Sequence, residues 1–151
     1  MMTAEVTAST EVVLPVSVEE AWAVLSDTRR MVALDPLIDA YEPEHGTIEA
    51  GTLNRVRSRL GPLRTTMTTR TELLEPPYRA VFVSVSPSRP VQARTEDTLE
   101  PANGGCRYRV TVTVTPTLPL LGPLLARVMI RTMVAGRHRF MERLHTAITE
   151  E

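Results

Sequence analysis

The C-terminal end of the chain places apolar side chains at the spacing of one helix face. Between residues 121 and 147 they recur at steps of three and four, the period of an amphipathic helix. The members of this stripe are Leu121, Leu125, Met129, Met133, Gly136, Phe140, Leu144 and Ala147. Pro123 fits a first helical turn, and no proline follows it. The pattern therefore predicts a helix from about Leu121 to Thr149, about 40 Å long.

The other side of this helix is polar. Its members, which we expect to be solvated, are Arg127, Arg131, His138, Glu142 and His145. The apolar stripe must then lie against another layer of the protein. Gly136 interrupts good helix formers within this stripe, at a cost of about 1 kcal/mol relative to alanine. Either a neighbouring backbone packs closely against Gly136, or the glycine leaves space for a ligand.

The N-terminal part of the chain predicts a strand and then a helix. Glu5–Leu14 alternates between two parities and stops at Pro15, as a half-buried strand does. Ser17 and Glu20 have the spacing of a capping box, in which each side chain satisfies a free backbone amide. The buried side of the capped helix is expected to consist of Val18, Ala21, Trp22 and Leu25. We interpret Trp22, the only tryptophan, as a core residue.

A second short helix and a series of strands follow. The helix is expected from Asp27 or Thr28 to about Leu34. Asp35-Pro36 then stops it, because a residue before proline prefers extended geometry. The segments with a period of two are Asp39–His45, Thr52–Leu60, Leu63–Glu72, Tyr78–Ser86, Val91–Glu100 and Arg107–Val114. The inner face of Tyr78–Ser86 stays open, since both of its parities carry apolar residues.

The order of elements predicts an α+β fold. One strand, two short helices, about six antiparallel strands and one long helix make up residues 1–151, which we interpret as a single domain. The outer parity of the strands is rich in arginine, threonine and glutamate, so the inner face of the sheet needs a cover. Only the terminal helix is long enough to provide it. We therefore expect an antiparallel sheet that curves around this helix.

The composition excludes several classes of function. With 17 basic and 18 acidic residues the net charge is −1, so no global field favours nucleic acid. Cys106 is the single cysteine, and the three histidines are scattered, which argues against a disulfide, zinc or haem. The sequence has no run of 18 apolar residues and no signal-peptide pattern. We expect a cytoplasmic protein without integral membrane association, metal or cofactor.

Several short motifs together resemble a known superfamily. They are Val12–Asp27 (VVLPVSVEEAWAVLSD), Leu34-Asp35-Pro36, Glu49–Thr52 (EAGT), Leu74–Pro77 (LEPP) and Thr98–Arg107 (TLEPANGGCR) before the long helix. The chain resembles the START-like or Bet v 1-like (SRPBCC) superfamily, and within it the bacterial polyketide cyclase/dehydrase and lipid-transport group. The resemblance implies a helix-grip fold, in which about seven strands wrap the terminal helix. It also implies a deep pocket for a hydrophobic ligand.

Such a pocket would be lined by inner-parity residues of the strands and by the apolar stripe of the helix. The predicted ligand-binding residues are Asn54, Val56, Ser58, Thr65, Met67, Thr69, Thr95, Val110, Met129, Met133 and Gly136. Methionines at this spacing either form an adaptable lining or fill a core. The threonines either orient a ligand or serve simply as good strand formers.

Asp97 and Tyr108 are the candidate catalytic residues. A carboxyl group among apolar neighbours has a raised pKa and is suited to proton transfer. Tyr108 is suited to hydrogen bonding with an enolate. The alternatives are that Asp97 faces solvent or pairs with an arginine, and that Tyr108 is a core residue with its hydroxyl at the rim. Asp35 either braces a turn or lies near the pocket mouth.

Three functional hypotheses remain open at this stage. The protein binds a hydrophobic or aromatic small molecule, polyketide-like or lipid-like, and catalyses its cyclisation or dehydration. Alternatively it carries such a ligand without chemistry, or it is a protein-interaction module like the cochaperone branch of the superfamily. The sequence does not indicate the identity of the ligand or the oligomeric state.

Overall fold

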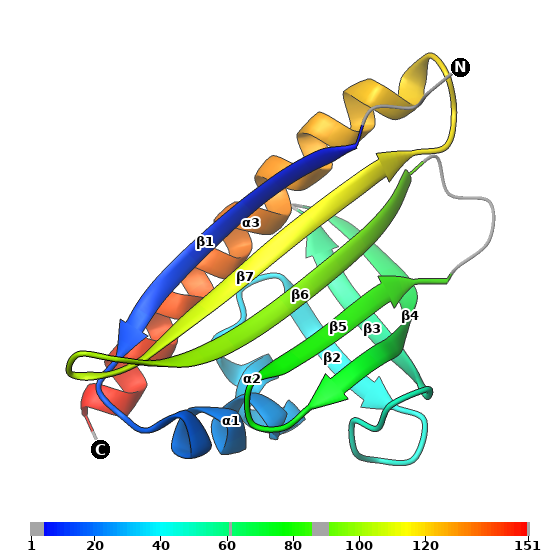
Figure 1. Ribbon diagram of the computed structural model, residues 1–151. Helices are drawn as coiled ribbons and strands as arrows, with labels where there is room; N and C mark the ends of the chain where they lie inside the picture. The colour runs from blue at the N-terminus through cyan, green and yellow to red at the C-terminus, as the bar shows by residue number, and fades with distance from the viewer. Residues whose placement is uncertain (1–4, 61, 86–90, 151) are drawn as a thin grey trace.

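The computed structural model describes residues 5–60, 62–85 and 91–150. Its helices and strands are β1 (Val6–Leu14), α1 (Val18–Ser26), α2 (Thr28–Leu34), β2 (Ile38–Pro43), β3 (Leu53–Leu60), β4 (Leu63–Glu75), β5 (Arg79–Ser84), β6 (Val91–Ala102), β7 (Gly105–Pro116) and α3 (Leu121–Thr149). A seven-stranded sheet curves beside the long helix α3, and the two short helices lie at one end (Figure 1). The predicted α+β architecture is confirmed.

The strands are antiparallel and follow the order β1-β7-β6-β5-β4-β3-β2. The chain therefore returns at β7 to pair with β1, and every other pair joins strands that are neighbours in sequence. The register brings inner-parity residues side by side: Val56 pairs with both Tyr41 and Met67. A shift in the β4–β5 register between Thr71 and Leu73 changes which parity of β4 faces inward.

The caps of the short helices follow the sequence closely, with one correction. The Ser17 Oγ accepts the Glu20 N–H at 3.1 Å, as predicted. The Glu20 carboxylate, however, accepts the Ser17 hydroxyl at 3.1 Å rather than a backbone amide. At α2, Asp27 is the N-cap, and its Oδ1 accepts the N–H groups of Arg29 and Arg30 at 3.1 and 3.3 Å.

The core lies between α3 and the strands β1 and β7. Its largest fully buried side chains include Leu14, Tyr108, Phe140, Met141 and Leu144. The helix face predicted to be polar is exposed at each of its five positions. In the C-terminal half of α3 the predicted apolar stripe also holds, since its members Gly136, Phe140 and Leu144 are buried there.

In the N-terminal half of this helix the predicted stripe is wrong at Leu121 and Leu125, whereas Met129 packs against the core as predicted. Leu121 and Leu125 have exposed fractions of 62% and 39%, and the positions that face the core are Gly122, Ala126 and Ile130. This half of α3 has apolar residues on two sides, so the periodicity alone could not identify which side is buried. The glycine and alanine explain the choice, because small residues allow the helix to approach β1 and β7 closely.

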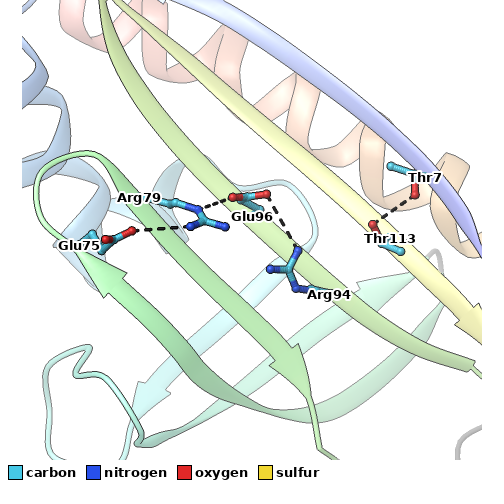
Figure 2. A network of polar contacts seen from close by, with 6 residues as sticks. All are labelled: Thr7, Glu75, Arg79, Arg94, Glu96 and Thr113. Atoms are coloured by element: carbon cyan, nitrogen blue, oxygen red, sulfur yellow. Dashed lines mark hydrogen bonds and ion pairs between the residues drawn. The ribbon is translucent and has the colours of Figure 1, made fainter.

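The outer face of the sheet carries the polar network drawn in Figure 2. Arg79 lies between Glu75 and Glu96, and Arg94 also approaches Glu96, at 4.0 Å. Across β1 and β7 the Thr7 and Thr113 hydroxyls are 3.3 Å apart. Exposed ion pairs of this kind contribute little to stability. These ion pairs show that this face of the sheet is exposed to water. A ligand site between the helix and the sheet therefore lies on the inner face.

Candidate functional site

A cavity of about 700 Å³ lies between α3 and the inner face of the sheet. Of the predicted ligand-binding residues, those that line it are Val56, Ser58, Thr65, Met67, Thr69, Thr95, Met129, Met133 and Gly136. The candidate catalytic residues Asp97 and Tyr108 line it as well. The inner parity of β3, β4 and β6 was therefore predicted correctly.

Asn54 and Val110 do not line the cavity. Both have no exposed surface. The Asn54 Nδ2 donates to the Thr71 Oγ1 at 2.9 Å and to the Thr69 Oγ1 at 3.4 Å, within a buried polar cluster. Val110 belongs to the core beneath α3. Parity identifies the side of the sheet that a residue faces, but not whether another side chain covers it.

The structure settles the strand whose inner face stayed open. Ala80, Phe82 and Ser84 of β5 line the cavity, and Phe82 pairs with Thr95 in the neighbouring strand. Val81 on the other parity is buried too, which explains why the sequence was ambiguous. Ser86, at the end of the predicted strand, lies outside the described residues.

Gly136 allows a close approach, though not by a backbone. A Cβ atom at this position would clash with Cδ1 of Leu37, which follows α2. Both residues line the cavity. The glycine therefore makes room for a side chain that closes one wall of the cavity beside the helix.

The cavity wall contains an ion pair between two elements. Arg137 on α3 places its Nη1 3.5 Å from the Asp35 Oδ2, and the two side chains have exposed fractions of 19% and 3%. The Asp35 Oδ1 also accepts the Leu37 N–H at 2.8 Å, so this carboxylate holds the turn after α2. The guanidinium lies over the Phe140 ring, 5.6 Å from its centre.

Asp97 and Tyr108 meet close to this pair, since the charge of Arg137 acts on both. The Tyr108 hydroxyl donates to the Asp97 Oδ2 at 3.2 Å. The other carboxyl oxygen, Oδ1, is shielded from solvent and has no hydrogen-bond partner among the described residues. Burial raises the pKa of Asp97 above its ordinary value, although the charge of Arg137 opposes the shift. A proton is therefore held more tightly here than on an exposed aspartate.

The aromatic hydroxyls and the guanidinium respond to the same surroundings. Burial, followed by the charge of Asp97, raises the pKa of Tyr108 far above its ordinary value. Burial likewise raises the pKa of Tyr41, which lines the cavity from β2. Burial by itself lowers the pKa of Arg137, yet Tyr108, Asp97 and Asp35 together raise it. Arg137 is therefore a permanent cation, and the tyrosines remain neutral donors.

Sequence reasoning missed Arg137 and Tyr41. Arg137 follows Met133 by four residues and precedes Phe140 by three, so a charged residue on the apolar stripe was a usable signal. Tyr41 alternates with Glu42 and Glu44, so the parity of β2 was a usable signal as well. A register shift between Ile38 and Ala40 separates it from Ile38, which also lines the cavity. Trp22 packs on the core but also lines the cavity.

No group of three His, Cys, Asp or Glu side chains gathers into a candidate metal site within the ranges that the structure describes. Of the helices in those ranges, none is long and apolar enough to span a membrane. The cavity offers a cation, two carboxyl groups, neutral tyrosine hydroxyls and several serine and threonine hydroxyls as its chemical groups.

The family model described as polyketide cyclase / dehydrase and lipid transport matches residues 4–149. The chain belongs to this family. Membership implies the binding of a hydrophobic ligand. No curated protein matches the chain.

Solved structures share the fold at low sequence identity. Ara h 8.0201 is 17% identical with a TM-score of 0.72, covering 98% of this chain and 100% of its own. A protein from Thermus thermophilus is 19% identical with a TM-score of 0.72, covering 97% and 98%. The di-domain ARO/CYC StfQ from the steffimycin biosynthetic pathway is 13% identical with a TM-score of 0.79. The match covers 97% of this chain and 51% of StfQ. The Bet v 1-like helix-grip fold is thus confirmed.

Proposed function

We propose that this protein binds a hydrophobic or aromatic small molecule, polyketide-like or lipid-like, in the cavity between α3 and the sheet. The volume of about 700 Å³ lies within the range of about 300–1,000 Å³ typical of small-molecule sites. Met31, Met67, Met129 and Met133 all lie in its wall. Their flexible side chains suit a flat or irregular apolar body.

One observation carries the proposal: the shielded Asp97 Oδ1 that has no partner among the described residues, in the same cavity as Arg137. An unsatisfied buried oxygen costs about 1–3 kcal/mol. Asp97 lines the cavity, so a rotation of its side chain would turn Oδ1 toward a ligand hydroxyl, and the hydrogen bond from that hydroxyl would remove this cost. A guanidinium has five N–H donors, so Arg137 would bind a carbonyl or phenolate oxygen. The ligand would therefore place its oxygen-bearing end here and its apolar body among the methionines.

The second part of the proposal is that Asp97 and Arg137 catalyse a cyclisation of the bound ligand. Ionised Asp97 would take a proton from a carbon beside a carbonyl, and Arg137 would stabilise the enolate oxygen that forms. The carbon would then bond to a second carbonyl of the same ligand, whose oxygen takes the proton back from Asp97. Tyr108 already donates to Asp97, so it would orient this carboxyl, and Arg137 would assume the role expected of Tyr108 at the enolate.

A carrier would use the same cavity without turnover. The raised pKa of Asp97 favours the enzyme, because it makes the ionised carboxyl a stronger base, which is of use in proton transfer and of none in transport. A protein-interaction module would need neither the cavity nor the buried polar end. The binding experiment below separates this third hypothesis from the other two.

Trp22 provides a direct test of binding. It is the only tryptophan and lines the cavity, so its fluorescence should change when a ligand enters. We would titrate the protein with hydroxylated polycyclic aromatics, matched unsubstituted hydrocarbons and fatty acids. Native mass spectrometry would give the stoichiometry. Saturable binding of one hydroxylated aromatic per chain is expected. Failure of every ligand would favour the protein-interaction module.

A matched pair of variants tests the polar end. Arg137→Gln would be combined with Asp35→Asn, so that Asp35 is not left as an unpaired charge. This variant should weaken binding of the hydroxylated ligand by about 10- to 100-fold, as expected for a lost hydrogen bond to a charged group, and affect the hydrocarbon little. Arg131→Gln on the exposed side of the same helix is the control. Equal losses for both ligands would contradict the proposed orientation.

A further inference from the structure

The first two turns of α3 and the residues before them expose several large apolar side chains. We call this set the apolar ridge; it comprises Leu118, Leu120, Leu121, Leu124, Leu125 and Val128. Their exposed fractions range from 39% to 89%. Within the described ranges, β1 and β7 make the most contacts with this helix, and its N-terminal end extends past the strands β2 to β5 (Figure 1). Contiguous exposed apolar surface of this kind usually marks an interaction site.

The apolar ridge continues into the cavity. Leu125 and Val128 belong to the ridge and also line the cavity wall. One turn further along, Met129 and Thr132 line the same wall. The ridge therefore borders an opening of the cavity, and whatever covers the ridge also lies at the entrance for a hydrophobic ligand.

The charged residues nearest to the ridge in sequence are all basic. Arg127 and Arg131 are exposed on the helix beside the ridge. Between Glu100 and Glu142 the sequence contains no acidic residue. The net charge of −1 for the whole chain conceals this local excess of cations. An apolar strip flanked by arginines suits a surface with an apolar interior and anionic headgroups, in which the arginine stems extend to the interface.

We propose that the apolar ridge docks on an anionic lipid surface, with its leucines in the acyl region and with Arg127 and Arg131 at the headgroups. The cavity opening then faces the lipid, and a hydrophobic ligand passes between bilayer and protein without crossing water. The proposal rests on the proposed function only for the identity of the ligand that passes. The docking itself is inferred from the exposed leucines and the neighbouring arginines.

A second copy of the chain fits the ridge less well. An antiparallel pairing centred on positions 121 to 128 would set Arg127 opposite Gly122 and Arg131 opposite Leu118. Neither partner position is acidic, so both arginines would be brought to the interface without a counterion. An anionic headgroup supplies that counterion.

The test compares vesicle binding of two double variants. Leu121→Gln with Leu124→Gln changes the ridge at residues outside the cavity wall, and Val13→Gln with Leu53→Gln changes exposed apolar residues elsewhere. Co-flotation would use vesicles of phosphatidylcholine alone and of phosphatidylcholine with phosphatidylglycerol in equal parts. The wild type should bind the mixed vesicles more tightly. The ridge variant should bind these vesicles more weakly, by about tenfold or more, because it lacks two leucines that would be buried in the acyl region. The control variant should bind as the wild type does.

Circular dichroism and the Trp22 titration without vesicles complete the design. Unchanged folding and unchanged ligand affinity in the ridge variant, with lost vesicle binding, would support the proposal separately from the proposed function. Equal vesicle binding by the ridge variant and the wild type would overturn it, as would no preference for the anionic mixture. In the remaining outcome, the wild type does not bind vesicles and forms a dimer in light scattering, whereas the ridge variant is a monomer. That result would overturn the proposal in favour of a second copy.

Discussion

Arg137 on α3 lies 3.5 Å from Asp35 at the end of α2, and both side chains are shielded from solvent. This pair joins the long helix to the turn that leads into β2. Asp35 also accepts the Leu37 N–H, so one carboxylate fixes the backbone of the turn and the position of the cation in the cavity.

Removal of Arg137 alone should be costly. Arg137→Gln leaves Asp35 without its cation, and loss of one partner of a buried pair costs about 3–5 kcal/mol. We expect a fall of about 3 kcal/mol in the free energy of unfolding by urea, at the lower end of that range, since the site borders a cavity. Adding Asp35→Asn should restore part of it. Arg131→Gln, on the exposed face, should stay within about 0.5 kcal/mol of the wild type. Equal effects of Arg137→Gln and Arg131→Gln would refute the pairing.

The stability of Asp97→Asn relative to the wild type should depend on pH. Burial raises the pKa of Asp97 in the folded protein, so the folded state holds the proton more tightly than the unfolded chain. The stability that this proton contributes is fully present below the ordinary aspartate pKa and is lost as the pH rises through the raised value. Asparagine does not ionise. Urea unfolding at a series of pH values should therefore show the variant gaining on the wild type as pH rises. A constant difference would mean that the pKa is not raised.

Gly136 and Leu37 should be coupled. In the wild type, Gly136→Ala places a Cβ against the Leu37 side chain, and overpacking of this kind costs about 1–3 kcal/mol. With Leu37→Ala already present the clash is gone, and the alanine should stabilise the helix by about 1 kcal/mol. Thermal or urea unfolding of the four proteins gives the sign in each background. The same sign in both would show that Leu37 does not require the glycine.

Asp97→Asn also separates enzyme from carrier. The affinity for a ligand should change little, because asparagine keeps the size of the side chain. Turnover of a cyclisable substrate should fall by about 10²- to 10⁴-fold, the usual contribution of general acid-base catalysis. Wild-type turnover should rise with pH as the raised pKa is passed. Unchanged turnover in the variant would remove Asp97 from the mechanism, and binding without turnover in the wild type would leave the carrier.

The sequence predicted the elements well because their signals are local. The Asp27 cap, the strand alternation and the absence of proline after Pro123 each act within a few residues, and the helix bounds Leu121 and Thr149 agree with the prediction. Inner parity also placed Asp97 and Thr95 in the cavity wall.

The errors arose where tertiary packing makes the choice. Leu121 and Gly122 both suit a buried helix face, and only the distance to β1 and β7 selects the glycine. Ile38 and Tyr41 both line the cavity although three residues separate them, because of a register shift in β2 that no short-range pattern encodes. Arg137 was overlooked because a cation on an apolar stripe is favourable only once Asp35, distant in sequence, is close to it.

The central claim is that the cavity holds an aromatic ligand with its oxygen-bearing end between Arg137 and Asp97. A crystal structure of the complex with the tightest hydroxylated aromatic from the Trp22 titration tests it most directly. We predict a ligand oxygen within about 3.2 Å of the Asp97 Oδ1 or of an Arg137 nitrogen, with the rings among the methionines. A ligand outside the cavity, or one whose oxygens point toward Leu125 and Val128 at the opening, would contradict the account.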